Sequence, residues 1–287
     1  MDAISDSVVV FGGGGIWGVA WMAGLVMGLA DEGVDLTHAR AFIGTSAGSI
    51  IGSQIAHGYS PTELFARQMD PTRQPGGSPQ PNDGLSQLIA LMQRPWENPE
   101  ARTTAVAELA LNTQPSSLPE SPADIAERLG VPSNEWPARE LSVTAVDIAT
   151  CELNVFHSQT GIGLIEAVAA SCAVPGVRPP IRIQGRLYMD GDLWHNPENA
   201  HLARSERSVL VVSPFGARTP ATPLSLHADV EDLRQSGSRV VLIAADNQAL
   251  ATLTPLGPLD PSVRTSAAEA GRAQGHREIE KLHAWIG

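Results

Sequence analysis

Cysteine is almost absent from this chain of 287 residues, which contains only Cys151 and Cys172. Because there is no Cys-x-x-Cys pair and no cluster of ligand residues around either thiol, the sequence indicates neither a disulfide scaffold nor a structural zinc site. We therefore expect two reduced thiols, as is typical of a cytoplasmic protein.

Positive charge is also scarce. The chain has 19 Lys and Arg residues against 31 Asp and Glu residues, which gives a formal net charge of -12 and a pI of about 5.0. This acidic balance argues against nucleic acid as a partner and against tight electrostatic binding to anionic lipid surfaces. Any contact with a membrane should therefore be weak or transient and should depend on apolar side chains.

Long apolar runs are lacking as well. No segment reaches the roughly 18 uninterrupted apolar residues that a membrane span needs, and residues 19–30, the nearest candidate, are interrupted by Gly24 and Gly28. The amino terminus carries Asp2 and Asp6 where a secretory signal would carry basic residues. Since no long linker divides the chain, we expect a single domain over residues 1–287, cytoplasmic and at most peripheral at a membrane.

What the chain does contain is a repeated pattern of strand, glycine-rich loop and helix. A β-branched strand at 7–11 leads through the glycines at 12–15 into a helix at 16–31. A second strand at 39–45 leads into a helix at 46–57. Two such units indicate a parallel sheet covered by helices. Further strands are expected at 141–147, 153–157, 208–213 and 239–244, a hairpin at 181–188, and helices at 163–172 and 262–285.

Residues 61–137 differ from the rest because they hold twelve of the 22 prolines and no strand-like run. Apolar residues recur there at helical spacing, namely Leu85, Leu88, Ile89 and Met92, and then Val106, Leu109 and Ala110. This pattern predicts a Pro-rich helical insertion outside the sheet. Two interpretations stay open: the helices cover the sheet, or they form a cap over an active site.

The stretch Gly44-Thr45-Ser46-Ala47-Gly48 joins the second predicted strand to its helix and fits the pattern G-x-S-x-G. In a nucleophile elbow, a sharp strand-to-helix turn raises the serine hydroxyl above the sheet edge. Glycines flank the serine because side chains there would collide with the strand and the helix. Ser46 is therefore the candidate nucleophile, although small residues also crowd ordinary tight turns.

The first glycine loop, Gly13-Gly14-Gly15-Ile16-Trp17-Gly18, permits two interpretations. It fits the dinucleotide pattern G-x-G-x-x-G after a strand, with Asp31 and Asp35 near the place of a ribose-binding carboxylate. Alternatively, its backbone N–H groups at a helix N-terminus form an oxyanion hole. The serine of the second loop favours the oxyanion hole, because a nucleotide site does not need a nucleophile.

A serine hydroxyl needs a base at neutral pH. The order of an α/β-hydrolase does not fit, since only one strand and one helix precede the serine. His57, His157 and His195 are conceivable bases, but each is more typical of a surface or strand-end histidine. Asp190 is better placed, because it ends a predicted strand and Gly191 follows it.

Taken together, the glycine loop, the G-x-S-x-G stretch and Asp190-Gly191, preceded by residues 170–175 and by Pro179-Pro180, resemble the patatin-like phospholipase family. The resemblance covers most of the chain outside residues 61–137 and implies a three-layer α/β/α fold with a mostly parallel central sheet. It also implies a Ser–Asp catalytic dyad in which Ser46 is the nucleophile and Asp190 the general base. The implied oxyanion hole is the backbone around Gly13, Gly14 and Gly15, and the supporting motif glycines are Gly18, Gly44, Gly48 and Gly191.

Three positions depart from the usual pattern of that family. Trp17 stands where Arg or Lys is usual, so a cation that could hold an anionic head group is missing, and helical geometry favours packed core or acyl-pocket wall over a membrane-inserting surface for it. Asp192 either raises the pKa of Asp190 or is a solvated turn residue, and the second interpretation is favoured. Arg178 precedes the two prolines where an aromatic residue is common.

We therefore expect a lipid acyl hydrolase that cleaves fatty acyl esters, phospholipids included, through an acyl-enzyme on Ser46, with no metal or organic cofactor. Transfer of the acyl group to an acceptor other than water would use the same residues. The alternative from a different class is a nucleotide-binding or non-catalytic protein that uses the glycine loop as a ligand cradle.

Overall fold

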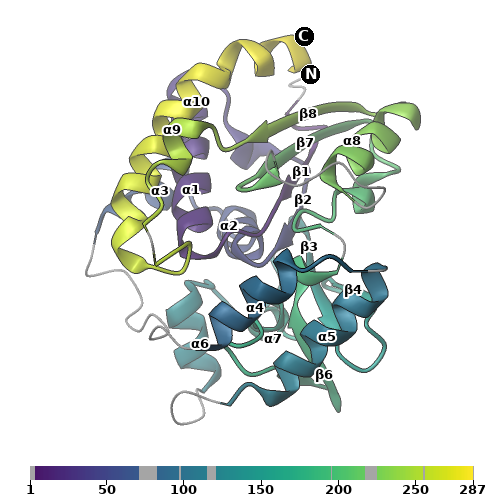
Figure 1. Cartoon of the computed structure of the whole chain (residues 1–287). Helices are drawn as coiled ribbons and strands as arrows, with labels where there is room; N and C mark the ends of the chain where they lie inside the picture. Colours follow the sequence, from purple (N-terminus) through teal and green to yellow (C-terminus); the bar gives the residue numbers. More distant parts are fainter. Residues whose placement is uncertain are drawn as a thin grey trace.

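The computed structural model describes residues 4–70, 83–96, 98–114, 121–194, 196–216, 225–254 and 256–286. His195, one of the conceivable bases, lies outside the described residues, as do residues 71–82, 97 and 115–120 of the proline-rich segment. Within the described ranges the chain forms one mixed sheet between layers of helices (Figure 1).

In the described part of the chain the sheet has eight strands in the order β5-β6-β3-β2-β1-β7-β8, and β4 also pairs with β3. The parallel strands are β1 (Val8–Phe11), β2 (Ala41–Thr45), β3 (Glu140–Asp147), β7 (Ser208–Ser213) and β8 (Arg239–Ala244). The strands that join through antiparallel pairs are β4 (Leu153–Phe156), β5 (Ile181–Ile183) and β6 (Arg186–Asp190). The predicted α/β fold with a mostly parallel sheet is confirmed.

Helices cover both faces of the sheet and complete three layers (Figure 1). One face carries α1 (Gly15–Asp31), α2 (Ala47–Ala56), α3 (Pro61–Met69), α6 (Pro122–Leu129), α7 (Leu164–Ser171), α9 (Asn247–Leu250) and α10 (Arg264–Ile286). The other face carries α4 (Asp83–Gln93), α5 (Pro99–Asn112) and α8 (Leu226–Gln235). Short 3-10 helices are η1 (Leu36–His38), η3 (Gly191–Leu193), η4 (Ala200–Ala203) and η6 (Pro261–Val263).

The alternation of side chains along β1 explains the hydrophobic layers on the two faces of the sheet. Val9 and Phe11 belong to the larger core, which contains Trp21 of α1. Val8 and Val10 belong to the core beneath α8. All four β1 residues are buried, as expected for a central strand with helices on both sides.

The glycines that interrupt the apolar run of α1 allow α10 to pack against it at very short range. A Cβ atom on Gly24 or on Gly28 would overlap the backbone of α10. Nε1 of Trp21 donates a hydrogen bond of 3.1 Å to Oε1 of Gln274 on that helix. The run is therefore a buried central helix, and within the described ranges no helix is long and apolar enough to cross a membrane.

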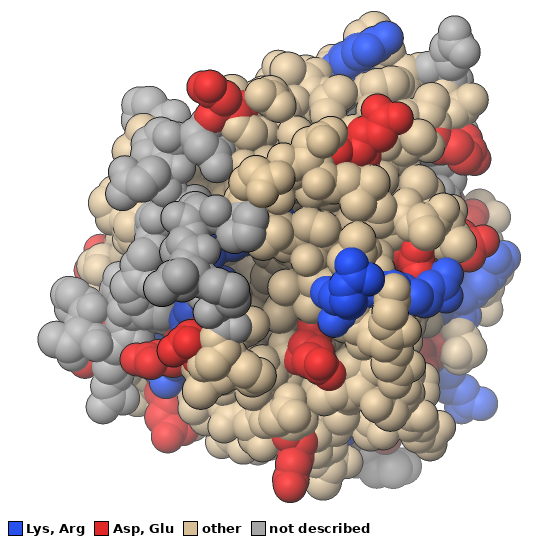
Figure 2. Space-filling view, turned by 90° about the horizontal axis from the view of Figure 1, so that it is seen from below, with Lys and Arg blue, Asp and Glu red and all other residues tan. Residues whose placement is uncertain are grey.

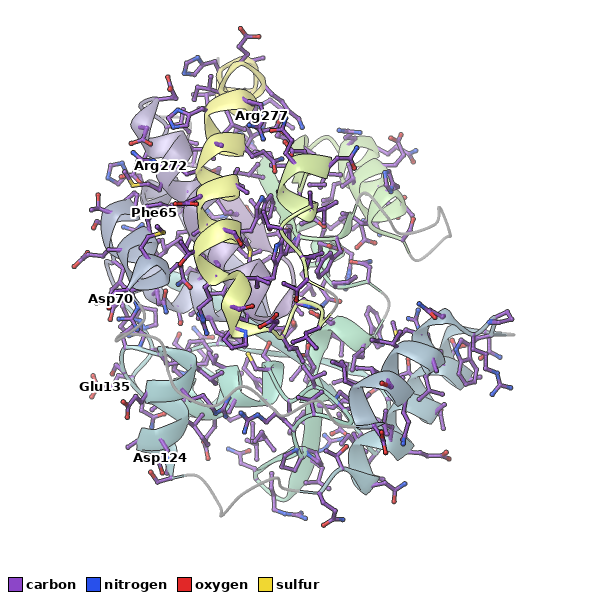
Figure 3. All side chains as sticks on the ribbon, turned by 60° about the vertical axis from the view of Figure 1, so that its left-hand side comes forward. Phe65, Asp70, Asp124, Glu135, Arg272 and Arg277 are labelled. Carbon is purple, nitrogen blue, oxygen red and sulfur yellow. The ribbon has the colours of Figure 1, made fainter. Side chains whose placement is uncertain are left out.

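The described part of residues 61–137 is helical and contributes no strand, as predicted. α3 packs against α1 and α10, where the guanidinium of Arg272 lies 5.3 Å from the ring centroid of Phe65 (Figure 3). On the other face, α4 and α5 bury Leu88 and Val106 in a cluster with residues of β3 and β6. Leu88 therefore covers the sheet, while the interpretation of the segment as an insertion and as a cap stays a prediction.

Candidate active site

A strained turn between β2 and α2 presents Ser46. Its backbone has φ 50° and ψ -115°, a conformation that is rare outside glycine and is often found at functional sites. A Cβ on Gly44 would lie 2.6 Å from the backbone oxygen of Gly48, and one on Gly48 would overlap the backbone of Phe11. The N–H of Ser46 donates a hydrogen bond of 2.8 Å to Oγ of Ser171. Close packing of α2 on β1 and β2 therefore requires both flanking glycines.

The register of the sheet brings Ser46 to Asp190. Asp190 ends β6 and pairs with Ala145 of β3. Thr45, the residue before Ser46, pairs with Thr144 of the same strand. As a result, Oγ of Ser46 donates a hydrogen bond of 2.8 Å to Oδ2 of Asp190, and the two residues are only 4% and 1% exposed. The residues predicted as nucleophile and base therefore lie in direct contact.

Asn199, which sequence reasoning missed, holds the turn that carries Asp190. Its Nδ2 donates hydrogen bonds of 3.2 Å to Oγ1 of Thr45 and to the backbone oxygen of Gly191. Oδ1 of Asp190 accepts a hydrogen bond of 2.9 Å from the N–H of Asp192. Asn199 is fully buried in the left-handed region with φ 53°, where asparagine is favoured, but no sequence motif marked it.

The glycine loop leads into the N-terminus of α1. The N–H of Gly13 already donates a hydrogen bond of 3.1 Å to the backbone oxygen of Pro197, which differs from the expectation that included it among the oxyanion donors. Within the described ranges, the N–H groups of Gly14 and Gly15 donate to no acceptor. Both lie at the start of α1, at the positive end of the helix dipole, so they stay the candidate donors.

Three carboxyl groups lie around the glycine loop, and of these Asp190 and Glu198 are buried while Asp192 is half-buried. Burial raises the pKa of Asp190 to about 7. The hydrogen bonds from the Asp192 N–H and from Ser46 lower this pKa, but their effect is smaller than that of burial. Burial also raises the pKa of Glu198 to about 7. The pKa of Asp192 lies well above its ordinary value because of burial, first, and then of the charges on Asp190 and Glu198. Near neutral pH this region therefore carries fewer negative charges than it has carboxyl groups.

Asp192 is not the solvated turn residue that the sequence favoured. Its Oδ1 is buried with no hydrogen-bond partner among the described residues, and its carboxyl group packs on Gly13, where a Cβ would overlap it. Glu198, which sequence reasoning missed, packs on Gly12, whose Cβ would lie 2.9 Å from the glutamate Cγ. Oγ of Ser213 donates a hydrogen bond to Oε1 of Glu198, while Oε2 has no partner in the described ranges. Glycines are thus needed here to make room for carboxyl groups.

Trp17 belongs to the core. Its ring stacks on Trp21 and on Phe215, with centroid distances of 6.0 Å and 5.4 Å, and its Nε1 donates a hydrogen bond of 2.8 Å to Oγ1 of Thr252. Trp17 and Trp21 are fully buried. The preference for packed core over a membrane-inserting surface is confirmed.

Of the three histidines considered as bases, the structure describes His57 and His157, and neither contacts the serine. The ring nitrogens of His57 contact the backbone oxygens of Ser53 and Glu135. The ring of His157 accepts a hydrogen bond from the backbone of its own turn. Neither ring hydrogen-bonds to Ser46 or Asp190. Among the residues that the structure describes, no group of three or more His, Cys, Asp or Glu side chains could hold a metal ion.

A cavity of about 130 Å³ lies beside Ser46. Its apolar walls include Ile16, Val19, Ile50, Leu129, Val177 and Leu259. Cys172 also lines it, and burial followed by the charge of Asp190 raises the pKa of its thiol to about 12, so the thiol stays protonated. Four arginines complete the lining, namely Arg67, Arg128, Arg178 and Arg264. On the face of the molecule seen from below, uncharged residues predominate, with a few charged side chains of both signs among them (Figure 2).

Residues 9–199 match the model of a family described as Patatin-like phospholipase. This range contains the glycine loop, Ser46 and Asp190. No match was found among curated protein sequences.

Two solved structures are similar over nearly the whole chain. VipD from Legionella pneumophila has a TM-score of 0.50 and 15% sequence identity, over 96% of this chain and 67% of that chain. ExoU, in the heterodimeric ExoU–SpcU complex from the type III secretion system of Pseudomonas aeruginosa, has a TM-score of 0.43 and 18% identity, over 96% of this chain and 51% of that chain. The chain thus spans about two thirds of VipD and about half of ExoU. At this identity the likeness to VipD concerns the fold.

Proposed function

The chain belongs to the patatin-like phospholipase family, and from this premise we propose that it is a lipid acyl hydrolase that cleaves fatty acyl esters through a Ser–Asp dyad. The observation that carries the proposal is the hydrogen bond of 2.8 Å from Oγ of Ser46 to Oδ2 of Asp190, at a strained turn beside a partly apolar cavity. A surface serine in a relaxed turn would need neither the strain nor the buried carboxylate.

In the first half of the reaction, Oγ of Ser46 attacks the acyl carbon while the carboxylate of Asp190 takes the hydroxyl proton. The ester C–O bond then breaks, and the proton passes from Asp190 to the oxygen of the leaving alcohol. In the second half, Asp190 takes a proton from water as that water attacks the acyl-enzyme. The fatty acid leaves, and Ser46 recovers its proton.

The environment of Asp190 suits a general base. A base works best when its pKa lies near the working pH, and burial raises the pKa of Asp190 to about 7. Burial without ionic partners would leave the carboxyl group neutral, but the hydrogen bonds from Ser46 and from the Asp192 N–H favour its charged form. Asp190 can therefore exchange its proton near neutral pH.

The oxyanion of the tetrahedral intermediate would be stabilised by the N–H groups of Gly14 and Gly15. Donors that are fixed before the reaction contribute about 3 kcal/mol each in other enzymes. The start of α1 adds the positive end of a helix dipole. This assignment replaces the Gly13 N–H, which already binds the backbone of Pro197.

The alternative, a nucleotide-binding or non-catalytic protein, would use the same N–H groups to hold a phosphate. Of the two carboxylates that could bind a ribose, Asp31 instead forms an ion pair of 2.7 Å with Arg272 of α10, and Asp35 accepts a hydrogen bond of 2.8 Å from the N–H of Thr37. The alternative also gives no role to the Ser46–Asp190 hydrogen bond. Ester hydrolysis accounts for both loops, and acyl transfer to an acceptor other than water would use the same groups.

Labelling with a fluorophosphonate tests the proposal, because this reagent reacts with activated serines. Wild-type protein should be labelled and should hydrolyse p-nitrophenyl esters, whereas Ser46→Ala should do neither while keeping its thermal midpoint. Ser53→Ala is the matched control on α2, since its Oγ only donates to the backbone oxygen of Ile50, and it should be labelled normally. An unlabelled wild type, or a labelled Ser46→Ala variant, would rule out Ser46 as the nucleophile and favour the ligand cradle.

A further inference from the structure

The arginines of α10 differ in how their charges are neutralised. Arg272 forms an ion pair of 2.7 Å with Asp31, and Arg277 forms one of 2.6 Å with Asp246 (Figure 3). Arg264, the first residue of the helix, forms no ion pair with a described carboxylate. Its Nη1 donates a hydrogen bond of 3.0 Å to the neutral Oε1 of Gln68, and its Nε is buried without a partner in the described ranges.

Arg67 of α3, which lines the same cavity as Arg264, repeats this feature. Its guanidinium lies 5.4 Å from the ring centroid of Tyr59 and near Gly130, whose Cβ would be 3.0 Å from Nη2. It, too, forms no ion pair with a carboxylate in the part of the chain that the structure describes. Burial, and then the charge of Arg67, lower the pKa of Arg264 to about 10, so the two cations repel each other.

Stability alone does not account for this arrangement. Two like charges lie close together, and Arg264 stands at the positive end of the α10 dipole, where a cation is unfavourable. The chain has a net charge of -12, so carboxylates are plentiful. On the surface, arginines such as Arg40 are paired with them. Unpaired cations in a cavity are what a binding site for an anion requires.

The cavity connects these arginines to the nucleophile. One face of α2 supplies Ser46, Ile50 and Gln54 to its wall, and Nε2 of Gln54 donates a hydrogen bond of 3.0 Å to the backbone oxygen of Gly130 beside Arg67. At a rise of 1.5 Å per residue, Gln54 lies about 12 Å from Ser46 along the helix axis. Ser46 and the two arginines therefore line one cavity.

Building on the proposed ester hydrolysis at Ser46, we propose that Arg67 and Arg264 form an anion subsite that binds a phosphate on the alcohol part of the ester substrate. A guanidinium group can donate two parallel hydrogen bonds to two oxygens of one phosphate, and a phosphate can accept hydrogen bonds from both arginines at once. Arg128 and Arg178 line the same cavity and add to its positive potential. The subsite supplies, from α3 and α10, the cation that is missing from the glycine loop at Trp17.

Binding to the Ser46→Ala variant tests the subsite without any turnover. The probes are decanoylglycerol phosphate and decanoylglycerol, titrated by calorimetry below the concentrations at which they aggregate. We expect the phosphate-bearing lipid to bind at least tenfold more tightly than the neutral lipid. Arg67→Gln together with Arg264→Gln should abolish that difference, whereas Arg277→Gln, on the same helix but outside the cavity, should preserve it.

In the active protein, the same pair of substitutions should raise KM for decanoylglycerol phosphate at least tenfold and change hydrolysis of decanoylglycerol by less than twofold. Equal binding of the two lipids to Ser46→Ala would overturn the proposal without any arginine variant. The proposal would also be overturned if the two arginine substitutions weakened the binding of both lipids equally in a folded protein. If inorganic phosphate bound as tightly as the phosphate-bearing lipid, the subsite would be one for free phosphate, and the proposed phosphate-bearing ester substrate would be refuted. Selective binding in a protein that fluorophosphonate does not label would refute the hydrolase and keep the subsite.

Discussion

An acidic and a basic group of side chains lie near Ser46, and no ion pair joins the two groups among the described residues. The acidic side consists of Asp190, Asp192 and Glu198, whose carboxyl groups lie around the glycine loop, with Asp190 and Glu198 buried. The basic side consists of Arg67 and Arg264, which line the cavity beside Ser46. Both sides contain buried polar atoms without a partner among the described residues, namely Oδ1 of Asp192, Oε2 of Glu198 and Nε of Arg264.

The difference between the two sides lies in how each can lose its charge. A buried carboxyl group becomes neutral by taking a proton, and the raised pKa values of Asp190 and Glu198, both about 7, reflect this. A guanidinium group stays protonated at neutral pH, even with the pKa of Arg264 lowered to about 10. The acidic side is therefore suited to moving protons, and the basic side to holding an anionic ligand.

Removing the charge of Asp190 should have the largest effect on the acidic side. Asp190→Asn keeps the shape of the side chain but cannot take the proton from Ser46, so we expect kcat for a p-nitrophenyl ester to fall about 10³-fold, within the range of general-base catalysis. Steady-state kinetics at pH 8 would measure it. His57→Ala and His157→Ala should each keep activity within about threefold of wild type. A folded histidine variant without activity would replace the dyad by a triad.

The acidic side shows what the sequence could provide. The elbow around Ser46 and the turn at Asp190-Gly191 are local sequence patterns. The contacts that require their glycines are only partly local: a Cβ on Gly44 would meet the start of α2, whereas one on Gly48 would overlap the backbone of β1 and one on Gly191 would lie 2.5 Å from a side-chain oxygen of β3. The pairing of Ser46 with Asp190 was implied by the resemblance to the patatin-like family, whereas their meeting through β3 is seen in the structure. Glu198 and Asn199 lie beyond the last motif, and their burial depends on tertiary packing that has no periodic signal.

The basic side could not be predicted in this way. Arg67 and Arg264 stand on α3 and α10, which are far apart in sequence, and each fits an ordinary helix surface when read alone. The two arginines meet because α3 and α10 both pack against α1. The glycines of α10 allow that helix to approach α1 closely. The loss of the loop cation at Trp17 was visible in the sequence, but the arginines elsewhere in the cavity were not.

The second prediction concerns stability on the acidic side. The pKa of Glu198 is about 7 in the folded protein against an ordinary value of 4.5, so the folded state holds this proton more tightly than the unfolded state. Its contribution is present below pH 4.5 and is lost as pH rises through 7. We expect the free energy of unfolding of wild type to fall by about 2 to 3 kcal/mol between pH 5 and pH 8 on account of Glu198 alone.

Urea unfolding at these two pH values would measure this loss. Glu198→Gln should reduce the difference in the free energy of unfolding between pH 5 and pH 8 by about 2 to 3 kcal/mol, because an amide does not titrate. The substitution should cost no hydrogen bond at Oε2, which has no partner among the described residues. Glu231→Gln, on the exposed surface of α8, is the control and should behave as wild type. An unchanged pH difference in Glu198→Gln would mean that Glu198 is ionised in the folded protein at pH 5.

The smallest effect is expected from Asp192→Asn, although the substitution is the same as at Asp190 and lies two residues away. Burial, and then the charges of Asp190 and Glu198, raise the pKa of Asp192 well above its ordinary value. This shift favours the neutral form of the side chain, which the amide of asparagine resembles. The N–H of Asp192, which donates to Oδ1 of Asp190, is unchanged. We expect kcat/KM within about twofold of wild type and the same rise of activity with pH, with its midpoint near 7 as Asp190 loses its proton. If Asp192 were instead ionised, removing its charge would lower the pKa of Asp190 and move that midpoint to lower pH. A pH–rate profile of the two proteins separates these cases, and a shift of one unit or more would show that the acidic side holds two charges rather than one.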